Sequence, residues 1–256
     1  MNTTHHPMGK SFKKLLKEQR PITGIFSGLN APFVIEMAAY AGFDFVIVDN
    51  EHGTSGYEST ENLLRTANSC GICAVVRTLP QDVSRLLDAG ASAIQIPMIE
   101  SSQQARQLVN QFRYPPDGAR GVAFSSRAAG YGAFGGVGHV DKSNSEIAFI
   151  AMIETPEGVK NAYEIANVDG VDAIFIGPND LSNSHGYGPD WREKPTMEII
   201  DKIIQEVKRA NKPVGILALD ASDKSSFASM GADYCVTVAS TVFTKALQSS
   251  FGDLSK

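Results

Sequence analysis

Two carboxylates of the sequence are candidates for binding a metal ion. Glu154 ends the apolar run AFIAMIE, and Asp180 lies in GPND, directly after the apolar run DAIFIG. Together they offer only oxygen ligands and leave several coordination positions for water or substrate, which is typical of catalytic Mg²⁺ or Mn²⁺ sites and not of closed Zn²⁺ sites. The alternative roles are structural: Asp180 as the N-cap of the short segment LSNS, and Glu154 as a cap before Pro156.

A second group of side chains is suited to handling charge and protons. Arg77 ends the apolar run ICAVVR, and its burial would be costly without an anionic partner. That partner is either a substrate carboxylate or enolate, or a structural ion pair with Asp49 or Glu51. His52 follows the strand that ends at Asp49, within reach of carboxylates that would fix its tautomer. We therefore expect His52 to act as a general acid or base.

The elements that carry these residues alternate between short apolar runs and amphipathic stretches, which is typical of βα units and a parallel sheet. Eight runs are nearly continuously apolar, as expected for strands covered on both faces; they begin at Ile22, Phe43, Ile72, Ser92, Ala148, Asp172, Pro213 and Asp233. Eight units predict one (β/α)8 TIM barrel domain over residues 1–256, with a doubly wound open sheet as the alternative. In a barrel the carboxyl ends of all strands meet at one rim.

Helices are predicted between these strands, and glycine marks three of their ends, in AGFD, AGAS and MGAD. The helices cover residues 32–41, 59–68, 83–89, 103–112, 156–167, 197–210, 222–230 and 241–249. Residues 114–146, between units four and five, are rich in Gly, Ser and Pro and too long for an ordinary connection. We expect this insertion to be a lid over the site. His139 within it is expected to be solvated or to act only through neighbours.

The bulk composition restricts the class of partner. The formal net charge of -5 leaves no polybasic surface for nucleic acid or an anionic membrane. No apolar run approaches the roughly 18 residues of a membrane span, and the first residues contain no signal peptide, so a cytoplasmic location is expected. Cys70, Cys73 and Cys235 form no disulfide framework, and the C-x-x-C leads into an apolar run without opening a helix. We therefore expect three reduced, buried thiols.

Several motifs at these positions occur together in a known family. The sequence resembles the HpcH/HpaI family of class II pyruvate aldolases, within the phosphoenolpyruvate/pyruvate superfamily, nearly from end to end. The motifs are VDNEH (48–52), VVR (75–77), IPMIES (96–101), YPPDGARG (114–121), IETPEG (153–158) and GPNDLS (177–182). The resemblance implies a lyase that reversibly cleaves a 4-hydroxy-2-oxo acid to pyruvate and an aldehyde through a metal-bound enolate.

The resemblance also implies roles for individual residues. Glu154 and Asp180 would bind a divalent cation such as Mg²⁺, Mn²⁺ or Co²⁺. Arg77 would hold the keto oxygen of pyruvate and stabilise the enolate charge. His52 and Asp49 would form an acid–base pair that acts through water.

The substrate pocket is implied in the same way. The main-chain N–H groups of Asn179 and Asp180 would bind the pyruvate carboxylate, and Leu217 would line that pocket. Two positions depart from the family pattern. Many relatives have Gln where this chain has Met152, and many have Ser where it has Phe124. Both changes remove a polar group close to the bound pyruvate or to the waters of the metal, so they bear on the substrate more than on the reaction class.

Other functions use the same platform. One is a decarboxylating synthase resembling macrophomate synthase, and another is a CoA-ester lyase resembling the citrate lyase β-subunit. A barrel that only binds a 2-oxo acid is disfavoured by the full set of catalytic residue types. Family members form hexamers in which the last helix swaps between barrels, and the apolar segment STVFTKALQSSF from Ser240 is compatible with a homo-oligomer of that kind.

Overall fold

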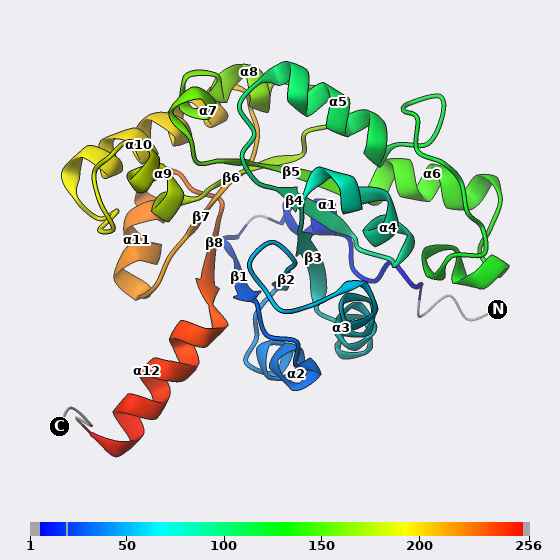
Figure 1. Ribbon diagram of the computed structural model, residues 1–256, viewed down its shortest axis with the longest axis horizontal. Helices are drawn as coiled ribbons and strands as arrows, with labels where there is room; N and C mark the ends of the chain where they lie inside the picture. Colours follow the sequence, from blue (N-terminus) through cyan, green and yellow to red (C-terminus); the bar gives the residue numbers. More distant parts are fainter. Residues whose placement is uncertain (1–5, 19, 253–256) are drawn as a thin grey trace.

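Eight parallel strands form a closed barrel in the order β1 to β8 in the computed structural model, which describes residues 6–18 and 20–252 (Figure 1). The strands are β1 (Ile22–Ser27), β2 (Phe45–Asp49), β3 (Cys73–Arg77), β4 (Ala93–Ile96), β5 (Ala148–Ile153), β6 (Ala173–Ile176), β7 (Val214–Leu217) and β8 (Tyr234–Val238). Each strand pairs in parallel with the next, and β8 closes on β1. The predicted TIM barrel is confirmed, and the open doubly wound sheet is excluded.

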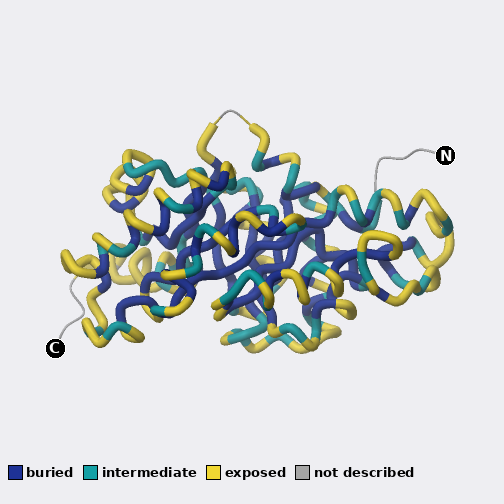
Figure 2. The backbone as a smooth tube through the Cα atoms, turned by 90° about the horizontal axis from the view of Figure 1, so that it is seen from above, coloured by how far each residue is buried: buried dark blue, intermediate teal, exposed yellow. Residues whose placement is uncertain are grey.

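Helices lie around the barrel (Figures 1 and 2). The buried residues of most of them pack on the outward faces of the strands. They are α1 (Phe12–Leu15), α2 (Pro32–Tyr40), α3 (Tyr57–Cys70), α4 (Val83–Asp88), α5 (Ser102–Phe112), α6 (Val137–Glu146), α7 (Pro156–Lys160), α8 (Ala162–Ala166), α9 (Pro178–Ser184), α10 (Lys194–Arg209), α11 (Ala221–Met230) and α12 (Ala239–Phe251). The glycines of the three predicted helix ends adopt positive φ, at Gly42, Gly90 and Gly231. This is the left-handed conformation that glycine adopts without strain.

The amino-terminal end of the barrel is filled by aromatic side chains. Phe12 of α1 is fully buried, with its ring centroid 5.0 Å from that of Phe45 and 5.7 Å from that of Tyr234. A Cβ at Gly24 or Gly215 would meet these rings, so both strands need glycine there. Because this end is packed, a ligand can enter the barrel only from the carboxyl ends of the strands.

Residues 114–146 contain more structure than a plain loop, namely the 3₁₀ helix η2 (Arg127–Gly132) and α6. The Arg127 side chain donates to the carbonyl oxygens of Ala89 (2.6 Å) and Pro7 (3.0 Å), which ties the segment to the amino-terminal stretch and α4. His139 is 1% exposed, so the expectation that it is solvated was wrong. A lid function for this insertion stays a prediction.

Helix α12 extends away from the barrel (Figure 1). None of the side chains from residue 240 to residue 250 is buried. In a complete barrel the last helix lies across the outer faces of the last and first strands. In the described part of the chain, a hollow lies at that position. No helix in the described part of the chain is long and apolar enough to cross a membrane.

Candidate active site

A cavity of about 280 Å³ opens at the carboxyl ends of the strands. It is lined by Phe26, Gly28, Asp49, His52, Arg77, Met152, Phe175, Gly177, Pro178, Asn179, Asp180, Leu217, Val238 and Ser240. Six of the seven predicted site residues are in this lining. Glu154, the seventh, lies directly beside it, because a Cβ on the lining residue Gly177 would touch its carboxylate.

Asp49 and Arg77 form a bidentate ion pair where β2 and β3 end side by side. Arg77 Nε donates to Asp49 Oδ1 (2.8 Å) and Nη2 donates to Oδ2 (2.6 Å). Burial alone would raise the pKa of Asp49, but the hydrogen bonds and charge of Arg77 hold that pKa below its usual value. Asp49 is therefore an anion that orients the guanidinium group.

Arg77 has a second acidic neighbour and an aromatic one. Its Nη1 lies 3.3 Å from Glu51 Oε2, and its guanidinium carbon lies 4.9 Å from the centre of the Phe26 ring. The structural ion pairs considered above are thus present. Because a guanidinium group carries five N–H donors, these contacts still leave donors of Nη1 and Nη2 for a ligand in the cavity.

His52 lies at the mouth of the cavity with 66% of its side chain exposed. Its main-chain N–H points to Asp49 Oδ1 at 3.4 Å, whereas its ring is nearest to Glu51, with 3.9 Å between Nε2 and Oε2. Asp49 therefore holds the backbone of His52 and does not contact its ring. Any proton exchange between these two side chains would need a bridging water.

Glu154 is the most buried carboxylate of the site, at 3% exposure. Its Oε1 accepts a hydrogen bond from the main-chain N–H of Met98 at 2.8 Å. Met98 has φ of 56°, the left-handed conformation that residues other than glycine rarely adopt. The loop after β4 thus adopts an uncommon backbone conformation where it aims this N–H at the carboxylate.

Burial raises the pKa of Glu154 to about 7, and the negative charges of Asp180 and Glu51 add to the shift, against the opposing hydrogen bond from Met98 and the charge of Arg77. Negative charge is therefore in excess around this carboxylate. A divalent cation would relieve it.

Glu154 and Asp180 are the two carboxylates predicted to hold a metal ion, and the charge of Asp180 acts on Glu154. Among residues 6–18 and 20–252 there is no group of three or more His, Cys, Asp or Glu side chains placed to hold a metal ion. A donor set of two carboxylates fits an oxygen-preferring divalent cation that completes its shell with water or substrate. The residues present therefore fit Mg²⁺, Mn²⁺ or a similar ion better than a closed Zn²⁺ site.

The residues predicted to bind the substrate carboxylate also line the cavity. Asn179 and Asp180 are in the first turn of α9, where main-chain N–H groups have no partner within the helix. Leu217, 7% exposed, ends β7 and supplies an apolar wall. Of the two departures from the family pattern, Met152 lines the cavity and Phe124 does not.

The family itself is settled by comparison with known proteins. Residues 22–244 match the family model described as HpcH/HpaI aldolase/citrate lyase. The chain belongs to this family. The hydroxypyruvate/pyruvate aldolase of Delftia acidovorans is 36% identical over 86% of this chain and 82% of its own length. The 4-hydroxy-2-oxo-heptane-1,7-dioate aldolase of Shigella sonnei is 32% identical over 94% and 93% of the two chains. The crystal structure of an HpcH/HpaI family protein from Burkholderia cenocepacia superposes with a TM-score of 0.88 at 30% identity, covering 93% of this chain and 96% of that chain.

Several residues of this HpcH/HpaI site were not predicted from the sequence. Gly177 and Met98 act through a missing Cβ and a main-chain N–H, which residue type does not signal. Ser240, from the first turn of α12, also lines the cavity. Gln95 is buried inside the barrel next to Met152. The sequence does contain a signal for Gln95, because it is a polar residue in the middle of an apolar run.

Proposed function

We propose that this chain is a metal-dependent aldolase that reversibly cleaves a 4-hydroxy-2-oxo acid to pyruvate and an aldehyde through the enolate of pyruvate. The observation that carries the proposal is the buried Glu154 carboxylate beside Asp180, with Arg77 across the same cavity. Relatives named as pyruvate aldolases and as 4-hydroxy-2-oxo-heptane-1,7-dioate aldolases support it over most of the chain.

Some residues of the site would stabilise charge, and others would position the substrate. A divalent cation held by Glu154 and Asp180 would supply Lewis acidity to the keto group of the 2-oxo acid. Arg77, held rigidly by Asp49, would place positive charge where the enolate oxygen develops. The N–H groups at the start of α9 would bind the substrate carboxylate, with Leu217 against its apolar side.

We assign proton transfer to His52, at the mouth of the cavity. Cleavage requires removal of the proton from the 4-hydroxyl group, and the imidazole of His52, with 66% of its side chain exposed, lines the cavity there. Because its ring does not contact Asp49, we propose that it acts through a water molecule. The aldehyde product would leave past His52, on the solvent side of the bound pyruvate.

The decisive measurement is pyruvate release from a 4-hydroxy-2-oxo acid, before and after EDTA and after re-addition of Mg²⁺, Mn²⁺ or Co²⁺. We expect chelation to abolish turnover and the ions to restore it. Glu154→Ala and Asp180→Ala should each lose the metal-dependent rate, while Glu198→Ala, an exposed carboxylate on α10, should keep it.

Full activity in a metal-free sample would refute the metal site. Decarboxylation of oxaloacetate without aldol cleavage would instead favour the decarboxylating synthase, and cleavage of a CoA ester would favour the CoA-ester lyase.

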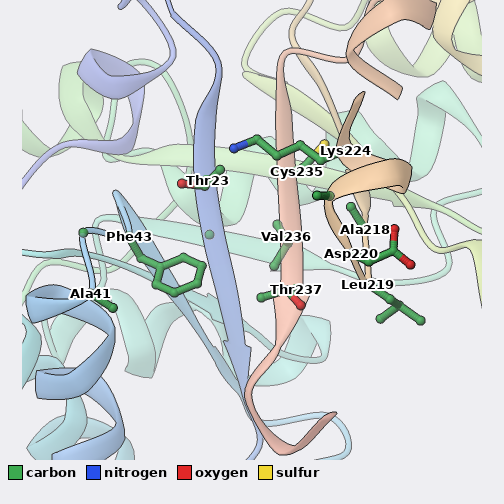
Figure 3. A pocket seen from close by; sticks show the side chains of 13 residues that line it. Thr23, Ala41, Phe43, Ala218, Leu219, Asp220, Lys224, Cys235, Val236 and Thr237 are labelled. Atoms are coloured by element: carbon green, nitrogen blue, oxygen red, sulfur yellow. The ribbon is translucent and has the colours of Figure 1, made fainter. Parts of the chain in front are cut away.

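The proposal includes a homo-oligomer in which α12 is exchanged between barrels. A hollow of about 300 Å³ lies on the outer faces of β1 and β8, where Thr23, Cys235 and Thr237 point away from the barrel (Figure 3). Ala41 and Phe43 close one side, and residues 218–221 close the other. This is where the last helix of a closed barrel packs.

Exposed apolar side chains lie on the two elements that such an exchange would join. On α2, Phe33, Met37 and Tyr40 are 57%, 54% and 81% exposed, at spacings that place them on one face. On α12, Val242 and Leu247 are 39% and 64% exposed. A second copy of this chain would cover both surfaces. By resemblance to the family, the whole assembly would be a hexamer.

A cytoplasmic location completes the proposal. Cys70, Cys73 and Cys235 are all free thiols. Cys73 and Cys235 are buried as expected, whereas Cys70, the last residue of α3, is partly exposed. Burial raises the pKa of Cys73 to about 12 and that of Cys235 to about 11, so neither is a reactive thiolate.

A further inference from the structure

Gln95 is a polar side chain enclosed by the barrel. It lies on β4, where Ile94 and Ile96 pack on the outer core and Ala93 packs inside the barrel. The alternation of a strand therefore places Gln95 inside as well. None of its surface is exposed, and in the parallel register it lies beside Arg77 of β3.

Among the described residues, the amide of Gln95 has one hydrogen-bond partner, which is a weak acceptor. Its Nε2 donates to the thioether sulfur of Met152 at 3.2 Å. Its Oε1 is buried and has no hydrogen-bond partner among the described residues. A thioether is a poor acceptor, and an unpaired buried amide oxygen is destabilising. The fold alone gives no reason for an amide here, because Leu would fill the position without either cost.

Turning the amide end for end does not remove the unpaired atom. The reversed amide would place Oε1 against the Met152 sulfur, two acceptors facing each other, and would leave Nε2 without an acceptor. The orientation with Nε2 toward sulfur is the one that satisfies at least one end. The unpaired atom is therefore an acceptor, and its missing partner must be a donor.

The neighbours of Gln95 belong to the active site. Met152, which touches the amide, lines the cavity together with Arg77, and Glu154 follows two residues later along the chain. The carboxylate and keto groups of a 2-oxo acid are acceptors only, so they cannot pair with Oε1. A water molecule can, and water bound to a divalent cation is an especially strong donor because its pKa is lowered.

We propose that Gln95 is a positioning residue whose amide oxygen accepts a hydrogen bond from a water molecule of the divalent cation bound by Glu154 and Asp180. The inference rests on the proposed function for the presence of that cation. Gln95 would then hold that water in one orientation, while Glu154 and Asp180 would hold the cation. Met152, an adaptable unbranched side chain, lies between Gln95 and the cavity that it lines.

The test compares Gln95→Leu with two other variants. Gln103→Leu makes the same change on the exposed face of α5 and serves as the control. The double variant Gln95→Leu/Met152→Gln moves the amide across the strand pair, since the two side chains are in contact. For each protein we would measure the Mn²⁺ dissociation constant from the EPR signal of free Mn²⁺. The urea midpoint of the metal-free protein and kcat and KM for pyruvate release complete the set.

We expect metal-free Gln95→Leu to unfold at the same urea concentration as the wild type or at a higher one, because an unpaired polar group is removed. Its Mn²⁺ dissociation constant should rise about tenfold or more, the usual effect of losing an outer partner of a metal site. The value of kcat should fall more than KM changes. The double variant should recover most of the affinity, and Gln103→Leu should match the wild type.

Unchanged Mn²⁺ affinity in Gln95→Leu would overturn the inference, as would a folded double variant no better than the single one. A lowered urea midpoint with wild-type Mn²⁺ affinity would make Gln95 purely structural. If Gln95→Leu weakens Mn²⁺ binding but the wild type itself releases no pyruvate from a 4-hydroxy-2-oxo acid, the aldolase proposal fails and the inference stands. If the wild type does not bind Mn²⁺, both fail.

Discussion

Glu154 combines two features that conflict in the metal-free protein. It is nearly buried, and its neighbours Asp180 and Glu51 are also acidic. A core position with this environment would normally carry an apolar residue or a carboxylate paired by a full ion pair. The arrangement is stable only if the carboxylate takes up a proton or a cation, which is the property a metal site requires.

This conflict predicts a pH dependence of stability. The pKa of Glu154 rises from 4.5 to about 7 in the folded protein, so between these values the folded state binds more protons than the unfolded state. The free energy of unfolding should therefore fall as the pH rises from about 4.5 to 7, by up to about 3 kcal/mol from this residue. Urea unfolding in EDTA at pH 5 and pH 8 should show Glu154→Gln gaining stability relative to the wild type at the higher pH. A difference that does not change with pH would contradict the prediction.

Substitutions of Arg77 and of His52 should impair different steps of the reaction. Arg77→Ala removes both a ground-state contact to the 2-oxo acid and enolate stabilisation, so kcat/KM should fall by about 10² or more. It also leaves Asp49 buried without its partner, so Arg77→Lys, which keeps the charge but not the bidentate pair, is the companion variant. His52→Ala should lose aldol cleavage and keep pyruvate binding.

Steady-state kinetics and pyruvate-proton exchange in D₂O separate these roles. Near-normal exchange and cleavage in Arg77→Ala would reduce Arg77 to a structural ion-pair residue. Loss of pyruvate binding in His52→Ala would remove it from the proton-transfer role.

The residues that could be predicted were those that close apolar runs. A charge at or shortly after the end of a buried strand is visible in the sequence, which is why the sequence predicts Glu154 and Asp180 together as candidate metal ligands. Met98 could not be found, because its contribution is a main-chain N–H in an uncommon conformation. Gln95 was overlooked because it interrupts a run without ending it, although a polar residue inside a barrel strand is itself informative.

At the scale of elements, the turn from β6 into α9 decides how close the ligands come. Gly177 stands at the N-cap of α9, and a Cβ there would overlap Glu154 Oε2 and lie 2.5 Å from the Met152 methyl group. The absence of a side chain therefore lets the helix that carries Asp180 approach the strand that carries Glu154. Pro178 then starts the helix with no N–H of its own to satisfy.

Gly177→Ala should consequently impair the site without altering the barrel. We expect Mn²⁺ affinity to fall about tenfold, because the Glu154 carboxylate must shift, and stability to drop by about 1–3 kcal/mol from overpacking. Gly138→Ala in α6 is the control, since a Cβ there meets nothing within 4 Å. Isothermal titration with Mn²⁺ and urea unfolding of both variants check the prediction. Wild-type Mn²⁺ affinity in Gly177→Ala would show that the contact relaxes freely.

Strands and helices could be predicted where the apolar residues follow one clear pattern. They could not be predicted where tertiary packing determines whether a segment is helical. The eight strands are continuous apolar runs and were found within a few residues. The predicted helix at 156–167 is divided into α7 and α8 at Asn161, whose φ of -100° and ψ of 13° leave the helical range. For residues 127–132 and 137–146 the sequence predicts only an insertion, because their helices contain glycine and serine and little apolar periodicity.

At the scale of the molecule, the closed barrel is confirmed, as are the family and the aldolase class of its relatives. Closure could be predicted because eight βα units in one chain leave few other folds. The position of α12, the helix of the eighth unit, could not be predicted. An apolar face indicates that a helix packs against something, but not whether its partner is its own barrel or another copy of the chain. In the structure α12 leaves its own barrel, and the hollow between α2 and α11 that would receive it remains open (Figure 3).

Exchange of α12 predicts that the oligomer depends on one face of this helix. Leu247 is 64% exposed and lies one helical turn from Phe243 on the apolar face, so Leu247→Asp would bury a charge at the contact. Losing a buried leucine costs about 1.5–3 kcal/mol per copy, which raises the dissociation constant of each contact roughly 10- to 100-fold before the charge is counted. Ser249→Asp adds the same charge two residues away, about 200° around the helix, and should leave assembly intact.

Sedimentation velocity at matched concentrations gives the result directly. The wild type and Ser249→Asp should sediment as one oligomer, and Leu247→Asp should form a smaller species that keeps its barrel by circular dichroism. Because Ser240 at the start of α12 lines the cavity, the smaller species should also bind the 2-oxo acid less tightly. A monomeric wild type would exclude the exchange, and an undiminished mass for Leu247→Asp would place the contact on another face of the molecule.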